Sequence, residues 1–157
     1  KRKGFTALHF AAQNNNIEIA KLLLSKPNID VNIQTSADGY FFEGNTYFTY
    51  TALHLAVQYD NIEIVKLLLS NSNIDVNIQI SHDRNMRYEG YTALHIAARN
   101  NDIGIVELLL SNPHIDVNIL DFRRMKAFDV TYDCEIRKLI MQRIVDDAKN
   151  VIEALKP

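Results

Sequence analysis

The chain has 157 residues, of which 47% are hydrophobic and 23% charged, and its formal net charge is −2. These values allow a sizeable core in one domain and offer no general electrostatic attraction to nucleic acid or to an anionic membrane surface. The single cysteine excludes an internal disulfide, and the apolar runs are too short to span a bilayer. We therefore expect an intracellular, cytoplasmic monomer with no nucleic-acid or membrane partner.

The first predicted elements are two short helices. Thr6 caps a helix at about 5–13 through its hydroxyl, and the asparagines at 14–16 tolerate the left-handed backbone that a tight turn needs. A second helix follows at about 17–25, and Pro27 ends it. Its apolar residues cover too wide an arc for one stripe, which is typical of a helix packed between neighbours in a stack.

The same pattern recurs twice more along the chain. Each copy has a Thr-Ala-Leu-His run, then an apolar run, then Ile-Asp-Val-Asn. The Thr-Ala-Leu-His runs lie at 6–9, 51–54 and 92–95. The apolar runs lie at 17–24, 62–69 and 103–110. The Ile-Asp-Val-Asn runs lie at 29–32, 74–77 and 115–118. An internal repeat built of short apolar helices predicts a solenoid.

These motifs resemble the ankyrin repeat, in which two antiparallel helices are followed by a β-hairpin finger. The Thr-Ala-Leu-His runs correspond to the family's Thr-Pro-Leu-His, with alanine in place of proline at the first helical position, where both residues are suitable. The resemblance covers nearly the whole chain. It implies an all-α ankyrin solenoid of helix-turn-helix units with β-hairpin fingers, and a protein that binds other proteins.

Two fingers are predicted to be enlarged. The Thr-Ala-Leu-His runs begin 45 and 41 residues apart, whereas the ankyrin period is about 33. The helical part has constant length, so the additional residues lie in the fingers at 33–50 and 78–91. Turn dipeptides at 38–39 and 44–45 among Tyr, Phe and Thr predict an extended hairpin in the first, and the turn of the second is expected near 83–85.

The C-terminal part departs from the repeat pattern. Lys-Ala-Phe-Asp-Val at 126–130 replaces the Thr-Ala-Leu-His run, with a second helix at 135–140 and a covering helix beyond 144. We expect one ankyrin repeat domain over 1–157, with repeats at about 1–34, 46–79 and 87–120, a degenerate one at 121–144, and a capping helix at about 145–156. The first repeat keeps an apolar outward side, which predicts further repeats or another domain before residue 1.

Residues that could carry chemistry are few. His9, His54 and His95 occupy equivalent positions in successive repeats, and stacked helices lie roughly 8–10 Å apart, too far for ligands that must lie about 2 Å from one zinc ion. We expect each histidine to bond the loops of its own and the neighbouring repeat, as the resemblance also implies. Cys134 stands between two acidic residues, which disfavours a thiolate nucleophile. We predict no catalytic residue, no metal, no cofactor and no enzyme.

Aromatic residues are concentrated in the predicted fingers, and two interpretations remain open. They either anchor a partner protein or pack across the hairpins and onto the neighbouring finger. Near the tip, residues 40–42 are the better candidates for binding, whereas Tyr47, Tyr50 and Tyr91, close to the helices, are the better candidates for packing. The basic residues at 123, 124 and 126 alternate with acidic ones, which indicates a solvated face of mixed charge.

The ankyrin resemblance implies that finger residues and the inner ends of the first helices bind the partner. In the first repeat these positions are Arg2, Lys3, Phe5, Gln13 and Asn14. The partner-binding residues predicted elsewhere are Tyr40, Phe41, Phe42, Tyr47, Phe48, Tyr50, Gln58, Tyr59, Tyr88, Glu89, Tyr91, Arg99 and Asn100. The function predicted is binding of a protein partner through a concave face and extended fingers. The alternatives are a targeting module of a larger enzyme, with catalysis outside this segment, or of a microbial effector acting in the host cytosol.

Overall fold

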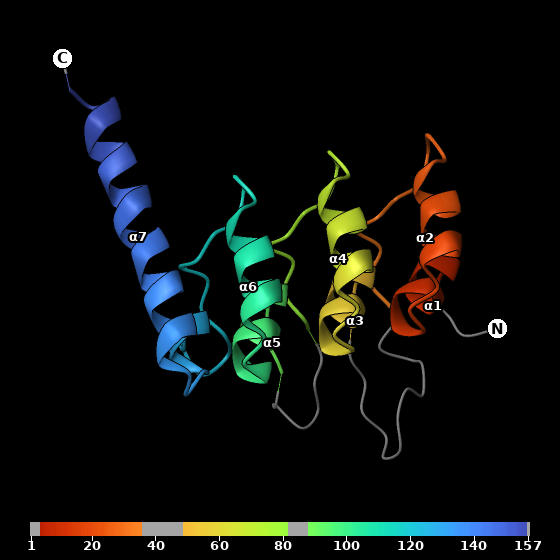
Figure 1. Ribbon diagram of the computed structural model, residues 1–157, viewed down its shortest axis with the longest axis horizontal. Helices are drawn as coiled ribbons and strands as arrows, with labels where there is room; N and C mark the ends of the chain where they lie inside the picture. The colour runs from red at the N-terminus through yellow and green to blue at the C-terminus, as the bar shows by residue number, and fades with distance from the viewer. Residues whose placement is uncertain (1–3, 36–48, 82–87, 157) are drawn as a thin grey trace.

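The computed structural model describes residues 4–35, 49–81 and 88–156, and all regular elements in those ranges are helical. The helices form antiparallel pairs that stand side by side in one row (Figure 1). The pairs are α1 (Ala7–Gln13) with α2 (Ile17–Leu24), α3 (Ala52–Gln58) with α4 (Ile62–Leu69), and α5 (Ala93–Asn100) with α6 (Ile103–Leu110). A 3₁₀ turn, η1 (Ala127–Asp129), and the long α7 (Cys134–Ala154) complete the row. This arrangement confirms the predicted all-helical repeat architecture.

Each first helix begins at the threonine that the sequence marked. In α1, Thr6 Oγ accepts the backbone N–H of His9 at 3.4 Å, and His9 Nδ1 accepts the Thr6 N–H at 3.1 Å. The same reciprocal cap forms in α3, and in α5 the Thr92 N–H donates to His95 Nδ1 at 3.3 Å. Histidine therefore takes the place that Glu or Gln occupies in the usual capping box, and the cap predicted at Thr6 is confirmed.

The turn between the helices of a pair uses a left-handed residue in place of glycine. Asn15, Asp60 and Asn101 have φ of 54°, 56° and 56°. Asn and Asp adopt this conformation more readily than other non-glycine residues, because their short side chains can bond the local backbone. The polar triplet at 14–16 was predicted to make this turn, and the structure confirms it.

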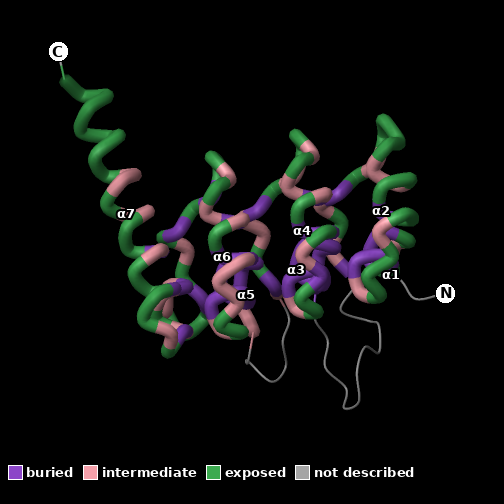
Figure 2. Tube along the Cα trace, in the orientation of Figure 1, coloured by how far each residue is buried: buried purple, intermediate pink, exposed green. Residues whose placement is uncertain are grey.

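The core lies between the pairs as well as within them. α1 packs on α3, α3 on α5, α2 on α4 and α4 on α6, and Figure 2 shows burial running continuously through the row. In the second pair Leu53, Leu55, Ile64 and Leu68 are at most 2% exposed. A repeat of this kind cannot bury its apolar faces alone, so the stability of each pair depends on its neighbours.

Polar side chains link each pair to the next. Asn32 Nδ2 donates to Asn73 O at 2.7 Å and Asn32 Oδ1 accepts from the Asp75 N–H at 2.9 Å. Asn77 repeats both bonds with His114 O at 2.8 Å and the Asp116 N–H at 2.9 Å. We call this series the asparagine ladder, and it sets the register of neighbouring loops.

The C-terminal region differs from the two helices expected there. A single 21-residue helix, α7, replaces the separate segments predicted at 135–140 and beyond 144. Residues 141–144 are Met, Gln, Arg and Ile, and with neither proline nor glycine among them nothing ends the helix between the two apolar segments. Ile136 and Ile140 are buried against the stack, whereas Val151 and Leu155 are 60% and 78% exposed. Figure 1 shows α7 extending beyond the other helices.

The enlarged fingers fall largely outside the described residues. The turn expected at 83–85 lies outside the described residues, and so do five aromatic residues of the first finger: Tyr40, Phe41, Phe42, Tyr47 and Phe48. The bases of both fingers are described. Thr35 N–H donates to Tyr50 O at 2.8 Å, and Ile80 N–H donates to Tyr91 O at 2.8 Å. The chain therefore enters and leaves each finger at adjacent points.

Candidate functional site

The C-terminal ends of α1, α3 and α5 present equivalent positions that differ from repeat to repeat. We call these residues the helix-end row; they are Gln13, Asn14, Gln58, Tyr59, Arg99 and Asn100. Because α1, α3 and α5 pack side by side, the row crosses three repeats. Tyr59 is 36% exposed, and the other members are partly or fully exposed. The stack thus brings together residues that are more than 80 positions apart in the sequence.

Contacts between neighbours hold members of this row in place. Gln13 Nε2 donates to the Tyr59 hydroxyl at 3.2 Å, which joins the first repeat to the second. The Arg99 guanidinium carbon lies 4.7 Å from the centre of the Tyr88 ring, a distance at which a cation is attracted by an aromatic face. Tyr88 in turn meets Tyr91 edge to face at 5.5 Å. The row therefore continues into the base of the second finger at Tyr88 and Glu89.

Among the predicted partner-binding residues that the structure describes, two are buried. Tyr50 is 6% exposed and Tyr91 is 1% exposed. The Tyr91 ring packs on His95 with centroids 5.2 Å apart. The burial of these two rings favours the packing interpretation for them, because each lies where the finger base closes over the first helix of its repeat.

Sequence reasoning missed the role of Arg123. It was assigned only to a solvated face of mixed charge, yet its Nη2 donates to the Tyr91 hydroxyl at 2.8 Å and to Asp121 Oδ2 at 3.2 Å. The Asp121 side chain is 1% exposed and also accepts the Met125 N–H at 2.8 Å. The proximity of Arg123 to Asp121 in the sequence was a signal for the ion pair. The contact between Arg123 and Tyr91 could not be predicted, because only the fold brings these two residues together.

The repeated histidines have structural roles. His9 Nε2 lies 3.0 Å from Tyr50 O, and His95 Nε2 lies 3.2 Å from Met125 O, so both rings join neighbouring repeats as expected. His54 keeps its cap, and its Nε2 meets no partner with full hydrogen-bond geometry among the described residues, although the backbone of Ile78 and Tyr91 acts to raise its pKa. Burial lowers the pKa of His9 and His95 and lowers the pKa of His54 to about 4. Within the described ranges, no group of His, Cys, Asp and Glu could hold a metal ion.

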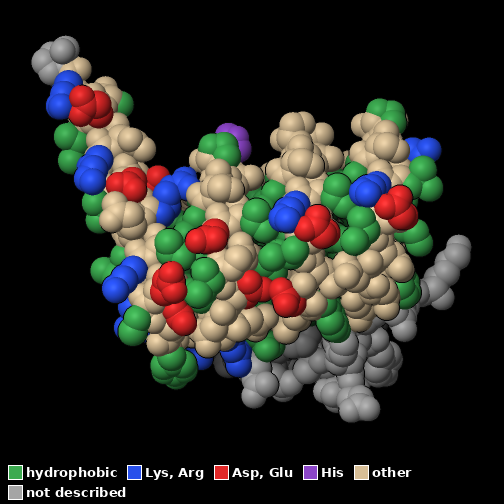
Figure 3. All heavy atoms as spheres, viewed as in Figure 1, with side chains coloured by type: hydrophobic (Ala, Val, Ile, Leu, Met, Phe, Trp, Pro, Cys, Tyr) green, Lys and Arg blue, Asp and Glu red, His purple; other side chains and the backbone are tan. Residues whose placement is uncertain are grey.

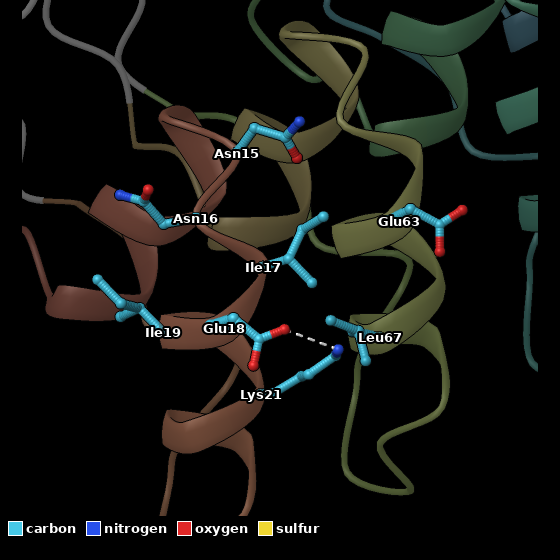
Figure 4. A pocket seen from close by; sticks show the side chains of 8 residues that line it. All are labelled: Asn15, Asn16, Ile17, Glu18, Ile19, Lys21, Glu63 and Leu67. Atoms are coloured by element: carbon cyan, nitrogen blue, oxygen red, sulfur yellow. Dashed lines mark hydrogen bonds and ion pairs between the residues drawn. The ribbon is translucent and has the colours of Figure 1, made fainter.

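Two hollows on the described surface are lined by a mixture of charged, polar and apolar side chains. One lies between α2 and α4 and is lined by Asn15, Asn16, Ile17, Glu18, Ile19, Lys21, Glu63 and Leu67 (Figure 4). The other runs along α7 and is lined by Glu135, Lys138, Leu139, Met141, Gln142 and Val145. The Glu18 carboxylate pairs with Lys21 at 2.9 Å, and Glu63 pairs with Lys66 at 2.7 Å. Figure 3 shows these charges as paired neighbours over α2 and α4, an arrangement typical of a solvated helix surface.

The fold and this surface define a stacked helical repeat protein with a variable row on a constant framework. A family model for ankyrin repeats in three copies matches residues 40–121, and one for a single ankyrin repeat matches residues 3–36. The chain belongs to the ankyrin repeat family, whose members are generally protein-interaction modules and typically non-catalytic. No curated protein matched the chain. No helix in the described ranges is both long and apolar enough to cross a membrane.

Proposed function

We propose that this chain binds a partner protein through the helix-end row together with the two enlarged fingers. The observation that carries the proposal is the contrast between framework and row. The Ala-Leu-His framework is identical in three repeats, whereas the row reads Gln-Asn, Gln-Tyr and Arg-Asn at equivalent positions. A common scaffold with a distinct surface in each repeat is how solenoids form extended binding faces.

The contacts within the row favour tight binding. Gln13 and Tyr59 are joined before a partner arrives, and Arg99 is stacked on Tyr88. Side chains that are already ordered lose less conformational entropy when a complex forms. Tyr and Arg are also the residue types that most often dominate the binding energy of an interface. Tyr59 and Arg99 are therefore the principal anchors of the proposed surface.

The fingers extend this surface in the proposal. Their bases lie beside α3 and α5, because Tyr50 and Tyr91 directly precede the caps of those helices. We expect each finger to form a β-hairpin, with residues 40–42 providing aromatic contacts to the partner. The interaction belongs in a reducing compartment such as the cytoplasm, because the single thiol, Cys134, is exposed and forms no disulfide.

The test is an affinity capture from cell lysate that compares the chain with three variants. Tyr59→Ala and Arg99→Ala remove the two anchors, and Tyr40→Ser with Phe41→Ser and Phe42→Ser alters the first finger. Lys66→Ala, on α4 and away from the row, is the matched control. We expect the anchor and finger variants to lose a partner that the control retains, at unchanged unfolding temperature. Retention of the same partner by all variants would show that the row and finger do not form the interface.

A further inference from the structure

One face at the N-terminal end of the row of helices is apolar and exposed. Phe10 on α1 and Ile19 and Leu22 on α2 are 43%, 48% and 62% exposed. The residues equivalent to Phe10 are Leu55 and Ile96, and those equivalent to Ile19 are Ile64 and Ile105; all four are at most 2% exposed. The N-terminal face therefore has the composition of an interior surface at a place where the stack ends.

The orientation of these side chains supports the equivalence. Figure 4 shows Ile17 and Leu67 pointing toward each other between α2 and α4, while Asn16 and Ile19 lie on the other side of α2. α1 and α2 stand at the end of the row opposite α7 (Figure 1). The Ile19 side chain thus points along the axis of the stack, away from the second repeat.

The structure identifies what covers such a face, because it shows the same face covered twice. α1 and α2 pack on α3 and α4, and α3 and α4 pack on α5 and α6. We propose that the N-terminal face is a stacking surface for one more helix pair of the ankyrin type. The partner surface has the character of the one that covers α3 and α4, with the small buried residues Ala11, Ala12 and Ala20.

The asparagine ladder gives an independent, polar argument for the same occupant. Asn32 and Asn77 each bridge a carbonyl and an N–H of the next repeat, two residues apart. The equivalent atoms in the first repeat are Asn28 O and the Asp30 N–H, and neither has a hydrogen-bond partner among the described residues. An asparagine at the corresponding position of a preceding helix pair would bond both.

A second polar contact points in the opposite direction. Asn61, at the start of α4, donates from Nδ2 to Ala12 O of the preceding repeat at 2.6 Å. Its equivalent is Asn16, which is exposed and caps no helix with its side chain. The last turn of a first helix placed on this face would supply the carbonyl that Asn16 lacks. The first repeat thus offers backbone atoms that an added repeat's asparagine would bond, and an asparagine side chain that would bond a carbonyl of the added repeat.

A second copy of this chain is not a suitable occupant. Its ladder residues Asn32 and Asn77 are already bonded within the copy. The next residue of the series, Asn118, accepts from Lys126 Nζ at 2.8 Å. The C-terminal side of the last pair is covered by α7, whose Ile136 and Ile140 are fully buried. An additional repeat with a free ladder asparagine supplies both the apolar surface and the hydrogen bonds that this face lacks.

The test adds such a repeat in place of residues 1–5 and leaves the rest of the chain unchanged. A copy of residues 51–91 is joined directly to Thr6, because Tyr91 precedes Thr92 as Phe5 precedes Thr6. We expect one cooperative unfolding transition at a higher temperature than that of the original chain. Ile19→Gln is then placed in both chains, and we expect it to lower the melting temperature of the extended chain by about 2–4 °C for each kcal/mol of stability lost, and to have a far smaller effect in the original. Asn77→Ala within the added copy is expected to lower the melting temperature of the extended chain as well.

The matched control is Val151→Gln, an exposed apolar residue on α7 at the far end, which is expected to have the same small effect in both chains. Separate melting of the added repeat, or equal effects of Ile19→Gln in the two chains, would overturn the proposal. So would a dimer of the original chain in sedimentation velocity that Ile19→Gln abolishes, because a second copy would then occupy the face.

Discussion

The Nδ1 atom of His54 lies 3.1 Å from the Thr51 backbone nitrogen and 2.8 Å from the Thr51 hydroxyl. The N–H must donate, so Nδ1 is the acceptor and carries no proton, and the cap requires a neutral ring. His54 is 2% exposed, and burial lowers its pKa to about 4. The histidine that completes the cap of α3 is thus also a buried titrating group.

We predict that the protein loses stability as the pH falls from about 6.5 to 4. An unfolded histidine has a pKa near 6.5, so in this range the unfolded chain binds a proton that the folded chain excludes. The stabilisation is complete above pH 6.5 and declines as the pH falls toward the folded pKa. The shift of His54 alone corresponds to a loss of about 3 kcal/mol, and His9 and His95 act in the same direction. Urea unfolding at a series of pH values measures this loss as a decrease in the free energy of unfolding.

The control for this prediction is His54→Gln. Glutamine can accept the N-cap N–H as in the common capping box but does not titrate. We expect this variant to be less stable at pH 7.5, because the buried ring is lost, and to show a weaker pH dependence than the unmodified chain. An unchanged pH dependence would mean that His54 is not the principal titrating group.

Loss of one link of the asparagine ladder should weaken the stack. Asn77→Ala removes two hydrogen bonds to the third repeat, and we expect it to lower the free energy of unfolding by about 1–2 kcal/mol, because exposed bonds of this kind each contribute modestly. Asn150→Ala is the matched control, since Asn150 is exposed on α7 and alanine favours the helix. Chemical denaturation measures the free energy of unfolding of both variants. Equal stability of the two would show that the asparagine ladder does not stabilise the contact between neighbouring repeats.

The glycines at 90 and 104 should respond in opposite ways to alanine. Gly90 has φ of +81°, and an added Cβ would lie 2.7 Å from Phe122 N and 2.9 Å from Asp121 Cα, both backbone atoms that cannot move independently. We expect Gly90→Ala to cost about 2 kcal/mol or more. In Gly104→Ala the Cβ meets the flexible end of Ile62 at 3.3 Å, and the gain in helix propensity of up to about 1 kcal/mol should dominate. Thermal denaturation measures both effects: the melting temperature should fall in Gly90→Ala and rise in Gly104→Ala.

Removal of Arg123 should destabilise the base of the second finger. Arg123→Ala leaves the Asp121 carboxylate, which is 1% exposed, without its cation. Because the arginine side chain is 49% exposed and screened by water, we expect a cost of about 1–2 kcal/mol. Arg123→Ala combined with Asp121→Asn should recover part of it, since the unpaired charge is gone. A double variant no more stable than the single one would locate the effect in the contact with Tyr91 instead.

Much of the fold could be predicted from the sequence because its signals are local. The threonine caps, the left-handed turn residues and the apolar helices each depend on a few neighbouring residues, and their recurrence three times identified the stack. The division of α7 into two helices was wrong, because an apolar pattern does not show whether a helix stops where its contacts stop. That outcome depends on a helix-breaking residue, and none is present between 140 and 145.

The sequence by itself determined the repeat, the helix boundaries to within a few residues, and the positions that vary on a constant framework. Only the tertiary structure decided that Tyr50 and Tyr91 are buried, since this depends on how a finger base meets the helix after it. It also decided that Arg123 bonds Tyr91 across 32 positions and that Ile19 is exposed where Ile64 is buried. Identical residue types have different environments because the environment is supplied by the neighbouring repeat, which local sequence does not encode.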